Sequence, residues 1–316
     1  MVQLALSTMW MQNRHRSLGE FFEAASQLGF DRFELNHFVS QELVEATRFQ
    51  PETIQGVHAP CPTHPHTRDA EMSSSDKDER ARAVEAATAS IRLAEQLGAT
   101  VVILHAGTVP VDPKLDGQLR DLYNRGEKHT GPYDNLKAEL SEQRAHLAER
   151  CLDATRRSLE RLADVADAAG IRLGLENRFS FQEIPIPDEL DLLLREFAGP
   201  VGFWLDTGHA YVLEELGFID HAEWLAGFAS HLVGAHLHDV RTVPQPPPFD
   251  TPPAPSSARL RDHDIPGTGV VDFGEILRAM PPAALLTCEV DFYHAPEQVK
   301  AGMEYLLSMN SRGGNR

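Results

Sequence analysis

Strand-type and helix-type segments alternate along the whole chain, and this alternation limits the fold more than any other feature. Eight short apolar runs predict strands at residues 4–9, 32–36, 53–60, 100–107, 172–177, 201–206, 232–239 and 284–290. Amphipathic helical segments separate them, which is the pattern of parallel strands joined by helical crossovers. Eight such units in 316 residues match the usual size of a (β/α)8 barrel. The sequence therefore predicts an α/β TIM barrel, formed as a single domain by residues 1–316.

Two helical segments are especially clear. In residues 76–98, apolar side chains recur at helical spacing before a stop at Gly98. A second helix runs from about residue 146 to Gly170. A doubly wound open sheet is the alternative fold, but no GxGxxG motif follows the first strand to support a dinucleotide-binding version.

Two segments interrupt the alternation and are expected to be insertions. Residues 108–140 form a polar insertion after the fourth strand, and residues 241–262 form another after the seventh. Seven prolines between Pro244 and Pro255 favour an extended loop in the second insertion. Because both segments follow strand ends, a barrel would place them on its C-terminal face, where lids belong. A surface excursion without a role explains the proline-rich segment equally well.

Composition narrows the classes of partner. The chain has 47 acidic and 29 basic residues, and its net charge of −18 disfavours nucleic acid and anionic membranes and favours metal cations. Its three cysteines lie far apart without a CxxC motif, which indicates neither a disulfide framework nor a structural zinc site and favours a reducing cytoplasm. No apolar run is long enough to span a membrane. We expect a cytoplasmic protein with a small-molecule substrate, and the sequence leaves open whether it forms a homo-oligomer.

Carboxylates and imidazoles follow most of the later strands. Parallel strands of a barrel point their C-terminal ends at one mouth, so these side chains are expected to meet. Taken singly, each has an ordinary explanation as a hydrogen-bonded structural residue or a turn former. Together, several buried carboxylates repel one another unless a cation lies between them. The residues are His58, His105, Glu176, Asp206, His209, His236, His263 and Glu289.

This pattern predicts a divalent metal site, because the strand ends supply mainly Arg178 and no lysine to balance the acids. Two Glu, one Asp and one His form an oxygen-rich set that suits Mn²⁺, Mg²⁺ or Co²⁺. Each additional histidine shifts the preference toward Zn²⁺ or Fe²⁺. The number of ions stays open, and more than one is compatible with the set.

The motifs at the strand ends resemble the xylose isomerase-like TIM-barrel superfamily, which contains sugar-phosphate isomerases and epimerases and the endonuclease IV type of apurinic endonuclease. The resemblance covers the chain from the first strand to the last helix, apart from the two insertions. LDTGHA and the H-x-H-D pattern are its most specific pieces. The matching motifs are GVHAP, ILHAG, GLENRF, WLDTGHA, GAHLHD, HDIPGTG and TCEV.

The isomerase and epimerase branch implies one divalent ion held by Glu176, Asp206, His236 and Glu289. In that branch the two glutamates act as acid and base and move a proton next to a carbonyl through a metal-bound enediolate. The run LENRF resembles the epimerase branch, which implies that Arg178 shapes the pocket of a small sugar or sugar-phosphate-like substrate and, with His209, orients its oxygens. In an alternating strand His238 shares the face of His236, which makes it a candidate either to contact substrate or to support a ligand. A barrel that only binds a sugar is a weaker alternative, because both candidate bases are present.

The endonuclease IV branch implies a multinuclear phosphodiesterase instead. Its additional metal ligands would correspond to His58, His105, His209 and His263. This chain departs from that branch at Arg261, which stands where an aspartate is expected, although Asp262 or Asp264 offers a replacement after a shift of the loop.

Overall fold

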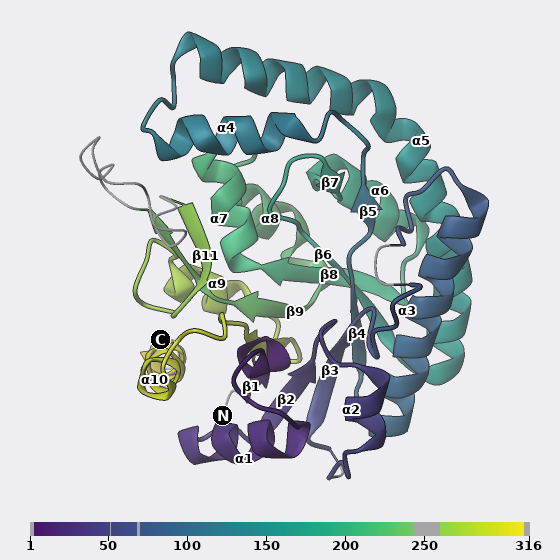
Figure 1. The fold of residues 1–316 in the computed structure, drawn as a ribbon, viewed down its shortest axis with the longest axis vertical. Helices are drawn as coiled ribbons and strands as arrows, with labels where there is room; N and C mark the ends of the chain where they lie inside the picture. Colours follow the sequence, from purple (N-terminus) through teal and green to yellow (C-terminus); the bar gives the residue numbers. More distant parts are fainter. Residues whose placement is uncertain (1–2, 51, 68–69, 243–259, 313–316) are drawn as a thin grey trace.

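Eight parallel strands close into a barrel in the computed structural model, which describes residues 3–50, 52–67, 70–242 and 260–312. The strands follow one another around the barrel in the order β1-β12-β9-β8-β6-β4-β3-β2 (Figure 1). Each of the eight predicted ranges contains one of them, so the expected TIM barrel is confirmed. The strands are β1 (Leu4–Ser7), β2 (Arg32–Leu35), β3 (Ile54–His58), β4 (Val101–Leu104), β6 (Arg172–Glu176), β8 (Val201–Asp206), β9 (Leu232–Leu237) and β12 (Leu285–Cys288).

Helices connect the strands and pack around the barrel (Figure 1). The predicted helix at 76–98 is present as α3 (Lys77–Leu97). Asp76 caps it by accepting hydrogen bonds from the N–H groups of Asp78 and Glu79, and Gly98 ends it at a φ of 73°. The other connections are α1 (Leu18–Leu28), α2 (Gln41–Glu45), α6 (Pro187–Glu196), α7 (Thr207–Glu215), α8 (His221–Phe228), α9 (Phe273–Ala279) and α10 (Pro296–Arg312), with short 3₁₀ turns η1 (Thr8–Met11) and η2 (Ala229–His231).

The segment 108–140 is mostly helical. It contains α4 (Lys114–Asn124) and the beginning of α5 (Gly131–Ala169), which therefore starts well before residue 146, where the sequence placed it. Pro132 lies in the first turn of α5, where a missing N–H costs nothing. The Arg120 guanidinium donates to the carbonyl of Phe179 (2.7 Å), and the Tyr133 hydroxyl donates to that of Leu216 (2.9 Å). The segment thus packs on the loop that follows β6 and on the C-terminal end of α7.

Two small antiparallel sheets extend the strand ends. Sheet β5 (Gly107–Thr108) and β7 (Glu183–Ile184) follows β4 and β6, and sheet β10 (Asp239–Thr242) and β11 (Leu260–Asp264) follows β9. Most of the proline-rich segment lies outside the described residues. The first sheet fixes the loop that carries Arg178, and His263 lies within β11 of the second.

Apolar side chains fill the space between barrel and helices, and a smaller group fills the inside of the barrel. This inner group contains Val101, Ile103, Trp204 and Val233. Trp204 stands edge-on to His236, with 5.1 Å between ring centroids. Gly234 makes room for the indole, because a Cβ there would lie 2.1 Å from a ring carbon of Trp204. Within the described residues, no helix has the length and apolarity needed to cross a membrane.

Replacing Gly234 by alanine should destabilise the fold by about 1–3 kcal/mol, because the added methyl group would overpack the inside of the barrel against Trp204. Urea denaturation measures the change in free energy of unfolding. Gly227→Ala is the matched control: its Cβ meets nothing within 4 Å in α8, so a change of up to about 1 kcal/mol toward higher stability is expected. Equal stability of both variants would contradict this account of Gly234.

Candidate metal centre

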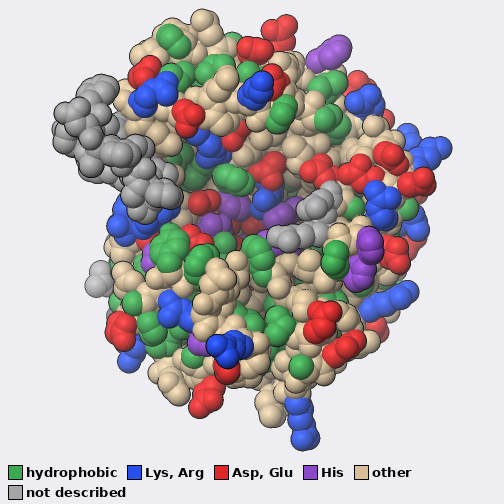
Figure 2. Space-filling view, viewed as in Figure 1, with side chains coloured by type: hydrophobic (Ala, Val, Ile, Leu, Met, Phe, Trp, Pro, Cys, Tyr) green, Lys and Arg blue, Asp and Glu red, His purple; other side chains and the backbone are tan. Residues whose placement is uncertain are grey.

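Four side chains from four strand ends meet at one point in the mouth of the barrel. Glu176 ends β6, Asp206 ends β8, His236 lies near the end of β9, and Glu289 follows β12. One donor atom from each lies within 4.8 Å of the others, and all four residues are buried. His236 Nδ1 is 2.8 Å from Glu176 Oε1, 3.1 Å from Glu289 Oε2 and 3.7 Å from Asp206 Oδ2. Figure 2 shows histidines and acids gathered in a hollow on this face.

The strand register and local hydrogen bonds place Asp206. It pairs directly with His236 of the neighbouring strand. Asn177 accepts from the Asp206 N–H (2.7 Å) and donates to its carbonyl (2.9 Å). Asp206 also caps α7, since Oδ1 accepts from the N–H of His209 (2.7 Å). In the turn between them Gly208 is required, because a Cβ there would lie 2.2 Å from the His238 ring.

The charges of this group fit a divalent cation. Burial by itself would raise the pKa of Glu176 and of Asp206, but neighbouring imidazoles hold both pKa values well below their ordinary range. Burial would lower the pKa of His236, yet the surrounding carboxylates, Glu289 first, raise it well above the ordinary value. Ionised carboxylates around an imidazole nitrogen are the donor set that Mn²⁺, Mg²⁺, Co²⁺ or Zn²⁺ takes.

Glu34 is a buried part of this site that the sequence did not reveal. Its Oε1 lies 2.9 Å from His236 Nε2, and its Oε2 accepts from the Thr287 hydroxyl (2.9 Å). A carboxylate at Nε2 keeps a proton on that nitrogen, which leaves the lone pair of Nδ1 to bind a metal ion. The available signal was an acid between Phe33 and Leu35 in an apolar strand, because an acid buried in a strand needs a specific partner.

On the other side of Glu176 lies a second group, which we name the His58–His105 corner. Glu176 Oε2 is 2.7 Å from His105 Nε2 and 3.3 Å from His58 Nε2. Arg178 reaches into the same corner: its Nη1 is 3.1 Å from Glu176 Oε2 and 2.6 Å from His105 Nε2. The three residues predicted at the ends of the third, fourth and fifth strands therefore converge, together with Arg178.

His238 supports Asp206 from behind and is fully buried. Its Nδ1 accepts from the backbone N–H of His263 (2.8 Å), so its Nε2 carries the proton that is donated to Asp206 Oδ2 (2.9 Å). Both ring nitrogens thus have protein partners. His263 itself adopts a left-handed conformation, with a φ of 50°.

His209 and His263 form a further group with Asp262. Each ring places Nδ1 on a backbone carbonyl, that of Asn177 (3.0 Å) and of Glu289 (3.2 Å) respectively, which leaves both Nε2 atoms as acceptors. Asp262 Oδ2 lies 4.0 Å from His209 Nε2 and 3.9 Å from His263 Nε2. Asp264 points elsewhere and pairs with Arg241 (3.0 Å) and Arg261 (2.6 Å). Asp262, not Asp264, therefore stands near the two imidazoles.

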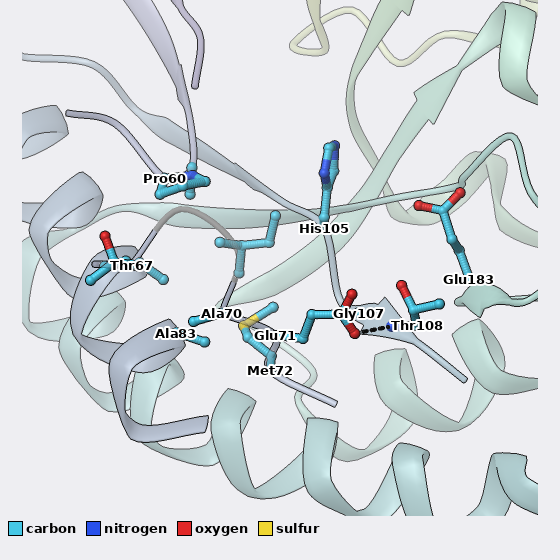
Figure 3. A pocket seen from close by; sticks show the side chains of 14 residues that line it. Pro60, Thr67, Ala70, Glu71, Met72, Ala83, His105, Gly107, Thr108 and Glu183 are labelled. Carbon is cyan, nitrogen blue, oxygen red and sulfur yellow. Dashed lines mark hydrogen bonds between the residues drawn. The ribbon is translucent and has the colours of Figure 1, made fainter. Parts of the chain in front are cut away.

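A cavity of about 330 Å³ adjoins the His58–His105 corner. His105 forms part of its wall, and Glu71 and Glu183 line it together with apolar side chains such as Met72 (Figure 3). Thr108 donates its backbone N–H to Glu71 (3.0 Å) at the edge of this cavity. The cavity offers space beside the candidate metal centre for part of a small molecule.

Binding of Mn²⁺ to the metal-free protein should release about one proton per ion near neutral pH. The raised pKa of His236 keeps its ring protonated without metal, and a cation at Nδ1 displaces that proton. Calorimetric titration in two buffers of different ionisation enthalpy measures the release, which should vanish as the pH rises above the raised pKa of His236.

The matched control for this titration is His146→Gln, which removes an exposed histidine of α5 and should leave the release unchanged. His236→Gln should lose it. Identical binding heats in both buffers for the unaltered chain would show that no proton leaves the site.

Three comparisons place the chain among known proteins. A family model described as the xylose isomerase-like TIM barrel matches residues 22–309. The comparison with curated proteins gives no match.

Solved structures with the same fold cover almost the whole chain. A structure of L-ribulose 3-epimerase has a TM-score of 0.64 at 15% identity and covers 99% of this chain and 95% of its own. The IOLI protein with a bound zinc atom has 0.63 at 14% identity and covers 100% of each chain. D-psicose 3-epimerase with D-tagatose, from Clostridium cellulolyticum H10, has 0.60 at 14% identity and covers 98% of this chain and 99% of its own. The family match confirms the resemblance carried by the strand-end motifs: the chain belongs to the xylose isomerase-like TIM barrel family.

Proposed function

We propose that this protein is a divalent-metal-dependent isomerase or epimerase of a small sugar or sugar-phosphate-like carbonyl compound. One observation carries the proposal: the carboxylates of Glu176 and Glu289 reach the same nitrogen atom, His236 Nδ1, at 2.8 Å and 3.1 Å from separate strands. The fold is shared with structures named as L-ribulose 3-epimerase and D-psicose 3-epimerase, which supports a sugar substrate.

The metal ligands in this proposal are Glu176, Asp206, His236 and Glu289. A divalent cation bound there supplies the positive charge that holds a sugar's oxygens and polarises its carbonyl group. Glu34 fixes His236 through Nε2 and His238 fixes Asp206 through Oδ2. Arg178 and His209 stand around the group and orient substrate oxygens.

The two glutamates are unequal as bases. Glu176 Oε2 lies 3.1 Å from Nη1 of Arg178, a permanent cation that stabilises the anion and weakens it as a proton acceptor. Glu289 Oε1 accepts from the Ser7 hydroxyl at 3.2 Å. Glu289 is therefore the better-placed group to remove a proton from the carbon next to the carbonyl.

Isomerisation and epimerisation would use the two glutamates differently. An isomerase needs one base, Glu289, to take the proton from one carbon and return it to its neighbour, and a hydroxyl proton must pass from one substrate oxygen to the other in the same reaction. An epimerase also needs Glu176 to exchange a proton on the opposite face of the substrate.

Glu289→Gln should lower turnover by about 10²- to 10⁴-fold, because an amide keeps an oxygen near the metal but cannot take a proton. The assay follows loss of the carbon-bound proton by NMR in D₂O, with a panel of ketoses and aldoses and with metal content measured in parallel. Glu95→Gln, on the exposed face of α3, is the control and should keep full turnover. Full turnover in the Glu289→Gln variant would rule out Glu289 as the base.

A second function, multinuclear hydrolysis of a phosphodiester, has one observation in its favour. The free Nε2 atoms of His209 and His263 and the Asp262 carboxylate offer three donors beside the first group. This function requires more than one ion per chain and hydrolysis of bis(p-nitrophenyl) phosphate by the zinc-loaded protein. A single ion without hydrolysis would exclude it, and the acidic net charge of −18 already disfavours a nucleic acid substrate.

A further inference from the structure

We propose that the Arg178 guanidinium takes the place of a metal cation in the His58–His105 corner, so that this corner holds a fixed protein charge and binds no ion. The inference rests on the proposed metal centre, because it assumes that Glu176 serves that centre through Oε1. It limits the number of ions that the mouth of the barrel can accept.

The corner has the donors of a metal site. His58 directs Nδ1 to the carbonyl of Ala59 (3.1 Å), which leaves Nε2 facing Glu176 Oε2 at 3.3 Å. His105 Nε2 lies 2.7 Å from the same oxygen, and the two rings stand at 86° with centroids 4.5 Å apart. Two imidazole nitrogens and a carboxylate oxygen this close are a donor set of the kind that binds Zn²⁺.

Arg178 already supplies the positive charge that these atoms require. Its Nη1 lies 2.6 Å from His105 Nε2 and 3.1 Å from Glu176 Oε2. One guanidinium nitrogen therefore contacts two of the three atoms that would bind a metal ion. A divalent cation among the same donors would lie against a like charge in a buried site, where repulsion is poorly screened.

The guanidinium is held in this position from behind. Arg178 Nε donates to Glu183 Oε1 (2.9 Å), while Glu183 Oε2 accepts from the N–H of Ser180 (3.1 Å). Arg144 of α5 donates to the carbonyls of Phe181 (2.7 Å) and Glu183 (3.0 Å). With only 12% of its side chain exposed, Arg178 is a built-in component of the corner.

The ion pair between Arg178 and Glu183 points the same way. Arg178 Nε lies 2.9 Å from Glu183 Oε1, and 16% of the Glu183 side chain is exposed. Displacing Arg178 to admit a second divalent ion would break its pair with Glu183 and leave that carboxylate without its buried partner.

The test counts zinc ions per chain by native mass spectrometry and elemental analysis, after zinc loading and removal of weakly held metal. Arg178→Ser removes the charge, Arg178→Lys retains a charge, and Arg120→Ser removes another arginine that contacts the same loop through Phe179. Arg178→Ser should bind one ion more than the unaltered chain, and the two controls should not. The additional ion should disappear in the double variant Arg178→Ser/His105→Ala.

No gain of zinc in a folded Arg178→Ser variant would overturn the proposal, as would an equal gain in Arg178→Lys. If Arg178→Ser does not fold, His105→Ala alone decides: unchanged zinc content supports the proposal, and loss of one ion overturns it. Because zinc content is read without any sugar substrate, a chain that lacks isomerase activity still gives an answer. Failure of the proposed function is thus distinguishable from failure of this inference.

Discussion

Four carboxylates buried around one imidazole ring are the constraint on which the rest of the site depends. Glu176, Asp206 and Glu289 approach His236 Nδ1 from the front, and Glu34 holds its other nitrogen. Burying so many anions together is unfavourable unless positive charge lies among them. The barrel can maintain this arrangement because strand pairing, and not the acids themselves, fixes where the side chains stand.

A second layer of contacts gives each member of the group a different environment. The Arg178 guanidinium contacts Glu176 Oε2, whereas a serine hydroxyl contacts Glu289 Oε1. In our proposal this difference gives the two side chains unequal basicity, as a proton-transfer site needs. Arg178 contributes to this difference and, in our proposal, also sets the number of cations. Mechanism and metal content are thus coupled through one arginine.

The fold and most site positions could be predicted from the sequence because both follow from short-range patterns. Apolar runs mark the strands, and a polar residue at the end of a parallel strand must lie at the mouth. The start of α5 was missed because the polar exposed face around Gly131 resembles a loop. Glu34 and the tautomer of His238 escaped because they depend on His236 and His263, which only the folded barrel brings close.

Anomalous diffraction from crystals of the zinc-loaded protein tests the central claim most directly. The account predicts a peak about 2.0–2.2 Å from carboxylate oxygens of Glu176, Asp206 and Glu289 and from Nδ1 of His236. An absence of zinc at this point, with the four side chains still converging on it, would contradict the claim that a cation holds the acids together.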